Sequence, residues 1–266
     1  MNMALASDAQ LADEVPVALV FNGISHAVMM ATPLHLEDFA LGFALTEGLV
    51  DHTQQVYGVE VLEHAMGLEV HIDIAAQCET RLKERRRQMA GRTGCGLCGA
   101  DSLAQVKLHL PQAPQVYVDV SAMQRAHAGL RALQPLKLQT GATHAAAWAD
   151  AQGHIQLVRE DVGRHNAIDT IAGWMWMNGV VANADSIFYT TGRLTSEMVM
   201  KSAQMGVAVV VSRSGITQMG YDVATRLQLC TIGRATNKHF LCYTASERLQ
   251  LDPTLAVGGV HKVAST

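Results

Sequence analysis

The stretch "SIFYTTGRLTSEMVMKSAQMGVAVVVSRSG", residues 186–215, decides how this chain folds. It holds two short apolar runs, at 187–189 and 207–211, separated by a segment whose apolar residues recur at helical spacing. A strand, a helix and a second strand in this order are typical of a layered sheet that carries helices on its faces. The stretch therefore predicts an α/β fold.

The same alternation extends on both sides of this stretch. A strand is predicted for "HIQLVRED" at 154–161 and a helix for "RHNAIDTIAGWMWMNG" at 164–179, whose "WMWM" is interpreted as a buried stripe. A further helix is predicted for 217–229, and a closing pair of strands for 230–244. Strands and helices thus alternate through the second half of the chain.

The first half of the chain has a different pattern. The segment 32–50 begins with Thr-Pro, carries acidic residues early and repeats apolar residues at helical spacing, which predicts a helix. Alternating segments at 57–64 and 68–75 predict strands, and 81–89 predicts a helix with a charged face.

Proline-containing stretches mark the expected domain boundary. The best candidates are 111–115 and 132–137. We expect residues 1–135 to form a smaller N-terminal domain with the two close cysteines, and residues 136–266 to form the regular α/β domain.

Composition narrows the classes of protein that fit. The chain has 266 residues, is 49% hydrophobic and can bury a substantial core. Charged residues make up 17% and the net charge is -4, so no nucleic-acid partner is expected. The start lacks the features of a secretion signal, and no apolar run is long enough to span a membrane. A cytoplasmic protein with reduced thiols is predicted.

Two of the five cysteines stand close together in "GRTGCGLCGADS", residues 91–102. Glycines around Cys95 and Cys98 favour a flexible loop over the rigid helix start of a thioredoxin-like site. Arginines nearby favour the thiolate, so the pair predicts a persulfide relay, with a redox pair as the alternative. The other three cysteines are interpreted as small buried apolar residues: Cys78, Cys230 and Cys242.

A metal site is a third possibility for the two close cysteines. Structural zinc normally needs four ligands, and the sequence has one close pair. His35 and Glu37, followed by Cys95 and Cys98, resemble the His-x-Glu … Pro-Cys-x-x-Cys pattern of zinc deaminases. However, Gly94 replaces the proline, the separation is long, and the upstream pair suits the first turn of a helix. We therefore expect no metal site.

Three polar junctions follow predicted strands, at 159–169, 190–201 and 212–220. Because open α/β sheets bind ligands at the carboxyl ends of their strands, we expect one shared pocket rather than three separate helix caps. Arg193 and Arg213 would donate to phosphate, and helix N-termini would add backbone amides. Neither Gly-x-Gly-x-x-Gly nor a P-loop pattern is present, so an anionic, phosphate-bearing ligand other than an ordinary dinucleotide is predicted. His144 has no assigned role.

Six stretches occur in the order seen in one known family. They are "TPLHLEDFALGFALTEGL", "RTGCGLCGADS", "TGATHAAA", "REDVGRHNAIDTIAG", "TTGRLTSEMVMK" and "VVVSRSGITQMGYDVA". Over nearly its whole length the chain thus resembles the formate dehydrogenase accessory sulfurtransferase family (FdhD). The resemblance implies a C-terminal, cytidine deaminase-like three-layer α/β domain without the catalytic zinc. It also implies a smaller N-terminal α+β domain that carries a flexible Cys-x-x-Cys loop.

The resemblance further implies an enzyme, a sulfurtransferase that acts as a sulfur carrier. In the family, a cysteine desulfurase loads sulfur as a persulfide, here on Cys95 with Cys98 as its helper. The sulfur then passes to the molybdenum cofactor, a bis-molybdopterin guanine dinucleotide, that formate dehydrogenase needs. This cofactor would be cargo rather than a permanent group, with GDP as a mimic, and a homodimer is implied. A non-catalytic chaperone that binds the cofactor is the alternative.

The cofactor contacts implied by the resemblance fall at the three polar junctions and in "RATNKH", 234–239. In the family, the last of these segments is typically aromatic and arginine-containing, whereas here it has fewer arginines and no aromatic residue. The expected contacts are Arg164, His165, Asn166, Gly192, Arg193, Ser196, Ser212, Arg213, Ser214, Arg234, Ala235, Thr236, Asn237, Lys238 and His239.

Overall fold

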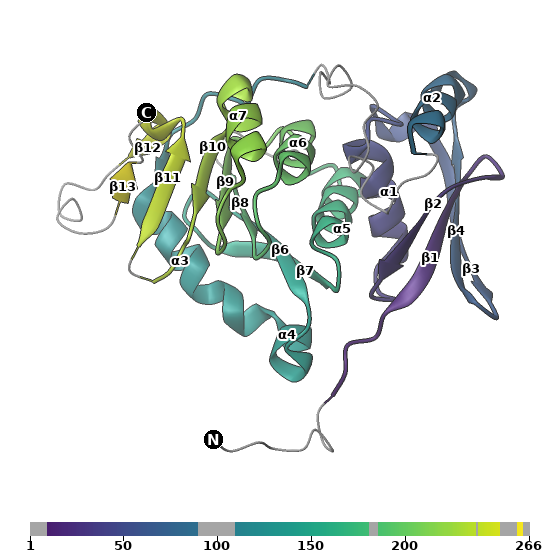
Figure 1. Cartoon of the computed structure of the whole chain (residues 1–266), viewed down its shortest axis with the longest axis horizontal. Coiled ribbons are helices and arrows are strands. Elements are labelled where there is room, and N and C mark those ends of the chain that lie inside the picture. The colour runs from purple at the N-terminus through teal and green to yellow at the C-terminus, as the bar shows by residue number, and fades with distance from the viewer. Residues whose placement is uncertain (1–9, 90–109, 181–185, 238, 251–259, 263–266) are drawn as a thin grey trace.

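The computed structural model describes residues 10–89, 110–180, 186–237, 239–250 and 260–262, and it is built around two large β-sheets (Figure 1). One sheet has four strands in the order β2-β1-β4-β3, and the other has seven in the order β13-β11-β10-β9-β8-β6-β7. A small third sheet pairs β12 (Leu249–Gln250) with β5 (Val118–Asp119).

The four-stranded sheet is formed by the N-terminal part of the chain. The predicted strands at 57–64 and 68–75 are confirmed as β3 (Val56–His64) and β4 (Gly67–Ile74). The predicted helices at 32–50 and 81–89 are confirmed as α1 (Leu36–Thr46) and α2 (Glu79–Met89).

A hairpin of β1 (Val15–Phe21) and β2 (Ile24–Ala31) completes this sheet and was not predicted. Asn22 and Gly23 join the strands with φ values of 48° and 75°. An Asn-Gly pair with two positive φ angles is the usual two-residue hairpin turn, so the sequence did contain a signal for it.

The seven-stranded sheet is formed by the C-terminal part and is mixed. Strands β8, β9 and β10 are parallel to one another, and β6 is antiparallel to both β7 and β8. Consequently β7, β8, β9 and β10 all end at the same edge of the sheet. The bounds are β6 His144–Ala149, β7 Ile155–Asp161, β8 Ile187–Thr190, β9 Val209–Ser212, β10 Cys230–Gly233, β11 Phe240–Thr244 and β13 Val260–Lys262.

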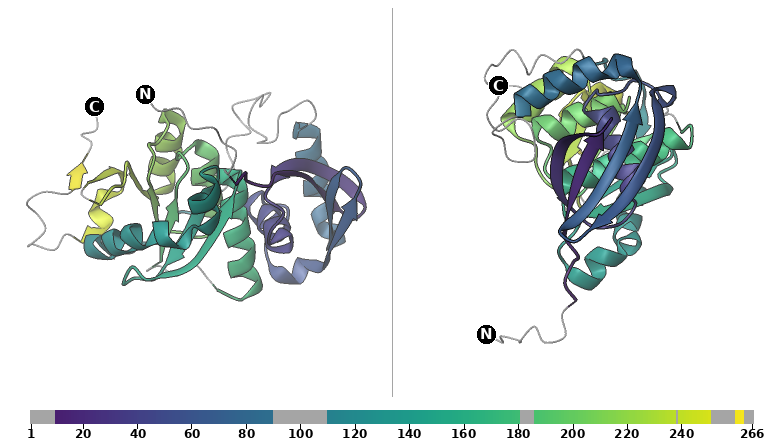
Figure 2. Two further views of the ribbon diagram at one scale, coloured as in Figure 1. Left: turned by 90° about the horizontal axis from the view of Figure 1, so that it is seen from below. Right: turned by 90° about the vertical axis from the view of Figure 1, so that its right-hand side faces the viewer.

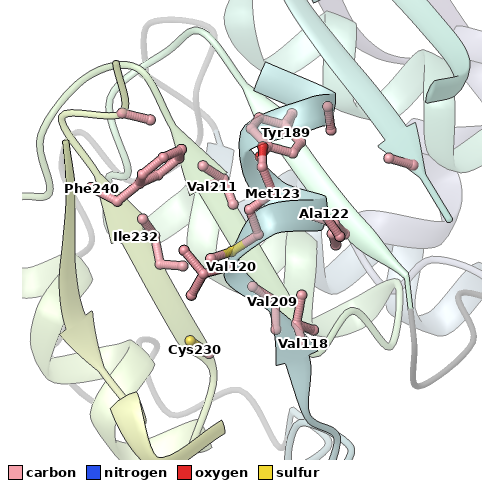
Figure 3. Close-up of a cluster of buried hydrophobic side chains, with 14 of the residues drawn as sticks. Val118, Val120, Ala122, Met123, Tyr189, Val209, Val211, Cys230, Ile232 and Phe240 are labelled. Carbon is pink, nitrogen blue, oxygen red and sulfur yellow. The ribbon is translucent and has the colours of Figure 1, made fainter. Parts of the chain in front are cut away.

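Helices cover both faces of this sheet (Figure 1). One face, with Phe188 and Val210, packs against α5, α6 and α7. The other face, with Tyr189 and Val209, packs against α3, as Figure 3 shows. The alternation follows from strand geometry, because successive side chains point to opposite faces. A three-layer α/β arrangement results, and the narrower likeness to cytidine deaminases stays a prediction. The helices are α3 Val120–Leu130, α4 Pro135–Thr140, α5 Arg164–Met177, α6 Ser196–Gln204 and α7 Gln218–Leu227.

The core of the large sheet begins earlier in the chain than residue 135. Residues from Val116 to Leu130 share a hydrophobic cluster with β6, β8, β9 and β10. In that cluster Met123 is fully buried, and the Tyr189 hydroxyl donates to its carbonyl. The division of the chain at 135 stays a prediction, but packing assigns α3 to the larger sheet.

Helices α1 and α5 join the two parts of the molecule, and α1 lies between α5 and the four-stranded sheet (Figures 1 and 2). A Cβ atom at Gly42 would lie 1.7 Å from the Asp169 carbonyl oxygen, and one at Gly173 would lie 1.8 Å from the Asp38 carbonyl oxygen. The helix backbones are therefore in direct contact at these two glycines, and no larger residue fits there without separating them.

The "WMWM" segment is only partly the buried stripe that was predicted. Met175 is buried, but Met177 is 56% exposed and the tryptophans are partly exposed. Trp174 and Met175 pack in the core of the large sheet, and Trp176 packs against the core of the four-stranded sheet. Within the described part of the chain, no helix is both long and apolar enough to cross a membrane.

A candidate anion-binding site at the edge of the large sheet

Three exposed arginines follow the carboxyl ends of three adjacent parallel strands. Arg193, Arg213 and Arg234 come after β8, β9 and β10, and neighbouring strands lie about 4.8 Å apart. The ion pairs formed among the described residues include none of the three. The structure thus brings these predicted residues to one edge, where their charges are available to an anion.

Hydrogen bonds fix the backbone of the loops that carry these arginines. The Ser212 hydroxyl donates to the Gly192 carbonyl at 2.6 Å and accepts from the Ser214 amide at 2.9 Å. The amide of Arg234, whose φ is 50°, donates to the Ser214 carbonyl at 2.8 Å. Ser212 is fully buried, so its side chain organises the loops.

The first turn of α5 reaches the same edge beside the β8–α6 loop. A Cβ atom at Gly192 would lie 2.9 Å from the Cβ and Cδ of Arg164, so glycine lets the arginine stem pass. His165 Nε2 lies 3.0 Å from Glu197 Oε2, with the two side chains 13% and 14% exposed. That separation is short, but its geometry is not that of a hydrogen bond.

Polar atoms without a hydrogen bond gather at this point. Arg164 Nε, His165 Nε2 and Thr195 Oγ1 are buried and have no hydrogen-bond partner among the described residues. Buried polar groups are rarely left unsatisfied, because each costs about 1–3 kcal/mol. Their convergence at the N-terminal ends of α5 and α6 is what an anion-binding site would require.

Asp161 holds the β7–α5 loop against the N-terminal part of the chain. Its carboxylate accepts from the amides of Thr32 at 2.9 Å and Gly163 at 2.7 Å, and from Asn166 Nδ2 at 2.8 Å. Burial raises the pKa of Asp161 to about 6, and these donors oppose that rise. Asn166 Nδ2 also donates to the Met30 carbonyl, so this side-chain amide serves the loop, and the expectation that it contacts a cofactor stays a prediction.

His144 belongs to this edge, although no role for it was inferred. It begins β6 directly opposite Asp161, and its Nδ1 lies 3.3 Å from the Thr191 hydroxyl. Burial lowers the pKa of His144, and the charges of Arg164, Lys137 and His165 lower it further. A neutral imidazole therefore lies next to the cationic groups, where it can donate or accept a hydrogen bond.

The segment after β10 forms a turn at the same edge. Ala235 is buried, whereas Thr236, Asn237 and His239 are exposed. The Thr236 amide donates to the His239 carbonyl at 2.9 Å, and the His239 amide donates to the Thr236 hydroxyl at 3.0 Å. Lys238 lies outside the described residues.

The remaining predicted residues divide into two groups. Ser196 is buried at the first position of α6, and Cys78, Cys230 and Cys242 are buried as predicted. Cys95 and Cys98 lie outside the described residues. In the part that is described, no three His, Cys, Asp or Glu side chains gather as a metal would require, and the expectation for the cysteine pair stays a prediction.

A cavity of about 420 Å³ lies at the other end of α5. Trp176, Met177 and Tyr57 line it, together with the carboxylates of Glu37 and Asp38. Its acidic wall does not suit an anionic ligand. Glu37 also lies in the first turn of α1, as was expected from the sequence.

Sequence reasoning missed Glu197, Thr191 and Thr195. Glu197 was readable only as an acidic residue in the first turn of a helix. Its approach to His165 depends on how α5 packs against α6, and no local pattern reports that contact.

Comparisons with known proteins give one consistent result. The model of the FdhD/NarQ family matches residues 12–250. The chain is 44% identical to a protein named Sulfur carrier protein FdhD from Cupriavidus necator, over 95% of this chain and 88% of that protein. It is 45% identical to a protein of the same name from Bordetella parapertussis, over 90% and 87%. A solved structure described as a formate dehydrogenase accessory protein, from Desulfotalea psychrophila, superposes with a TM-score of 0.71 at 25% identity over 91% of each chain.

Proposed function

Because this chain belongs to the FdhD/NarQ family, we propose that it is a sulfur carrier that serves formate dehydrogenase. Relatives that share about 44% of its residues are named sulfur carriers, which supports this role. In the proposal, Cys95 carries the sulfur, Cys98 assists it, and the edge of the large sheet binds the molybdenum cofactor that receives the sulfur.

The loading step is a thiol–persulfide exchange. The Cys95 thiolate attacks the terminal sulfur of a persulfide on a cysteine desulfurase. A new sulfur–sulfur bond forms on Cys95, the old one breaks, and the desulfurase cysteine leaves as a thiolate. The proton on the terminal sulfur stays with it, so no external oxidant or reductant is needed.

The arrangement of arginines is the observation that carries the cofactor assignment. Arg193, Arg213 and Arg234 lie at adjacent strand ends without a described acidic partner. Guanidinium groups donate to phosphate in pairs, and each hydrogen bond to a charged group contributes about 1.5–3 kcal/mol. A guanine dinucleotide offers a diphosphate that matches this row of donors.

Calorimetric titration with GDP tests the cofactor site. We expect wild type to bind, and Arg193→Ala to weaken binding about tenfold or more, because one charge-assisted contact is lost. Arg226→Ala removes another exposed arginine, one in the last turn of α7 just before β10 begins and so at the opposite edge of the sheet, and is the matched control. Equal GDP affinity for wild type, Arg193→Ala and Arg226→Ala would rule out the proposed site.

Mass spectrometry after incubation with a cysteine desulfurase and cysteine tests the carrier role. Wild type should gain a sulfur adduct that Cys95→Ala lacks. An equal adduct on Cys95→Ala would remove Cys95 from the mechanism.

A non-catalytic chaperone remains the second candidate function, and one observation favours it. Among the described residues, the loops of the strand-edge site are joined by hydrogen bonds that involve no cysteine, such as those of Ser212 with Gly192 and Ser214. If the chaperone role is correct, Cys95→Ala still supports active formate dehydrogenase and Arg193→Ala does not.

A further inference from the structure

Helices α5 and α6 are connected by a His–Glu contact and by an ion pair, which together form a short ladder. His165 and Asp169 are four residues apart on α5, and Glu197 and Lys201 are four residues apart on α6. Residues at this spacing lie on one face of a helix, one turn apart. His165 lies 3.0 Å from Glu197, and Asp169 lies 2.9 Å from Lys201.

The inner pair of this ladder is buried and fully hydrogen-bonded. Lys201 Nζ lies 2.9 Å from Asp169 Oδ1, 2.8 Å from Glu47 Oε1 and 2.9 Å from Thr46 Oγ1. An ammonium has three hydrogens to donate, and these three acceptors use all of them. The Thr46 hydroxyl in turn donates to Asp169 at 2.6 Å.

Burial acts on both members of the inner pair: it raises the pKa of Asp169, and Lys201 and the Thr46 hydroxyl oppose that rise. Asp169 is 1% exposed and Lys201 is 6% exposed. Burial lowers the pKa of Lys201, but Asp169 and Glu47 outweigh that effect and raise it above its usual value. Lys201 is therefore protonated at neutral pH and fixed in position by α1 as well as by α5.

A contribution to folding stability does not by itself explain why Asp169 and Lys201 form a buried ion pair. Removing two charges from water is costly, and replacing a buried ion pair by apolar residues is often neutral or stabilising. Directional hydrogen bonds do something that apolar contacts do not, because they specify one register between two helices.

The order of charges in the ladder enforces that register. The carboxylate is on α6 in the outer pair and on α5 in the inner pair. If α6 slid by one turn in one direction, Glu197 would meet Asp169 and two carboxylates would face one another. If it slid in the other direction, Lys201 would leave Asp169 buried without its cation, so both slipped packings are disfavoured.

We propose that Asp169 and Lys201 are positioning residues for the anion site. Their pair sets how the first turns of α5 and α6 lie relative to each other, and thereby places His165 and Glu197 at the edge of the sheet. Thr46 and Glu47, at the end of α1, bind the same Lys201 ammonium. One cluster of hydrogen bonds therefore connects α1, α5 and α6. This inference rests on the proposed function, since it takes that edge to bind the cofactor.

The double variant Asp169→Leu/Lys201→Met tests this role, because it replaces both charges with apolar groups of similar size. We expect it to fold and to bind GDP about tenfold more weakly than wild type, since small displacements of binding groups are costly. The ring signal of His165 in a histidine NMR spectrum should shift in the absence of ligand. A folded double variant with unchanged GDP affinity and an unchanged His165 signal overturns the proposal.

Thr46→Val is a second, milder variant that removes only the hydroxyl shared by the pair. It should weaken GDP binding by a few fold and move the His165 signal in the same direction. Thr170→Val is the matched control, because Thr170 is also buried and its hydroxyl donates to the Asn166 carbonyl within α5. If Thr170→Val has effects equal to those of Thr46→Val, the ladder has no special role.

These measurements separate the inference from the proposed function. If wild type does not bind GDP, the proposed cofactor site fails, while the His165 signal still reports whether the inner pair positions the outer one. An unchanged His165 signal in Asp169→Leu/Lys201→Met and Thr46→Val, with GDP bound normally by wild type, overturns the positioning role alone.

Discussion

Replacing Gly173 with alanine should destabilise the protein, although alanine favours helices. A Cβ atom at Gly173 would lie 1.8 Å from the Asp38 carbonyl oxygen and 2.7 Å from the Gly42 amide nitrogen. Both obstacles belong to the backbone of α1, so no side chain can turn aside. The helices must separate by more than an ångström to restore an ordinary contact.

The size of the effect follows from two opposing terms. Overpacking costs about 1–3 kcal/mol and more when backbone must move, whereas alanine gains about 1 kcal/mol over glycine inside a helix. We expect a net loss of about 2 kcal/mol in the free energy of unfolding. In a chain of this size, that corresponds to a decrease of about 4–8 °C in the unfolding temperature.

Gly129→Ala is the matched control for this experiment. Gly129 is also in a helix, and its added Cβ would lie 3.7 Å from Ile155 Cδ1, an ordinary contact. It should raise stability by up to about 1 kcal/mol. Thermal and urea unfolding of both variants measure the difference. If Gly173→Ala is as stable as Gly129→Ala, the close approach of α1 and α5 is not as described.

Three further changes test other parts of the structure. Gly192→Ala should weaken GDP binding several-fold with little loss of stability. The added Cβ would lie 2.9 Å from the Cβ and Cδ of Arg164 and would displace that side chain. Unchanged GDP affinity in a titration would contradict this. The pKa of Asp161 is about 6 in the folded protein, against an ordinary 3.8, so the folded state binds this proton more tightly than the unfolded state. The free energy of unfolding should therefore fall by about 2–3 kcal/mol as pH rises from about 4 to about 6. Asp161→Asn, which cannot ionise, should flatten that fall in urea unfolding across this pH range, and an unaltered slope would assign it to another group. Tyr189→Phe removes the hydroxyl that donates to the Met123 carbonyl and should cost about 1 kcal/mol or more, whereas no loss on urea unfolding would show that this hydrogen bond contributes nothing.

Most of the α/β part could be predicted from the sequence, because its strands and helices are local patterns. Apolar runs such as 207–211 and the helical spacing after residue 194 depend only on neighbouring residues. The positions of Arg193 and Arg213 directly after strands were also enough to predict where they lie. The β1–β2 hairpin was missed even though Asn22 and Gly23 signal it.

Only the tertiary structure decided which side chains complete the site. Asp161 meets the Thr32 amide across 129 positions, and Lys201 meets Thr46 across 155. His165 approaches Glu197 because α5 and α6 pack side by side, and His144 joins them because β6 lies between β7 and β8. Periodicity reports which face of an element is buried, whereas these contacts depend on which elements become neighbours, and that is set by the packing of the whole chain.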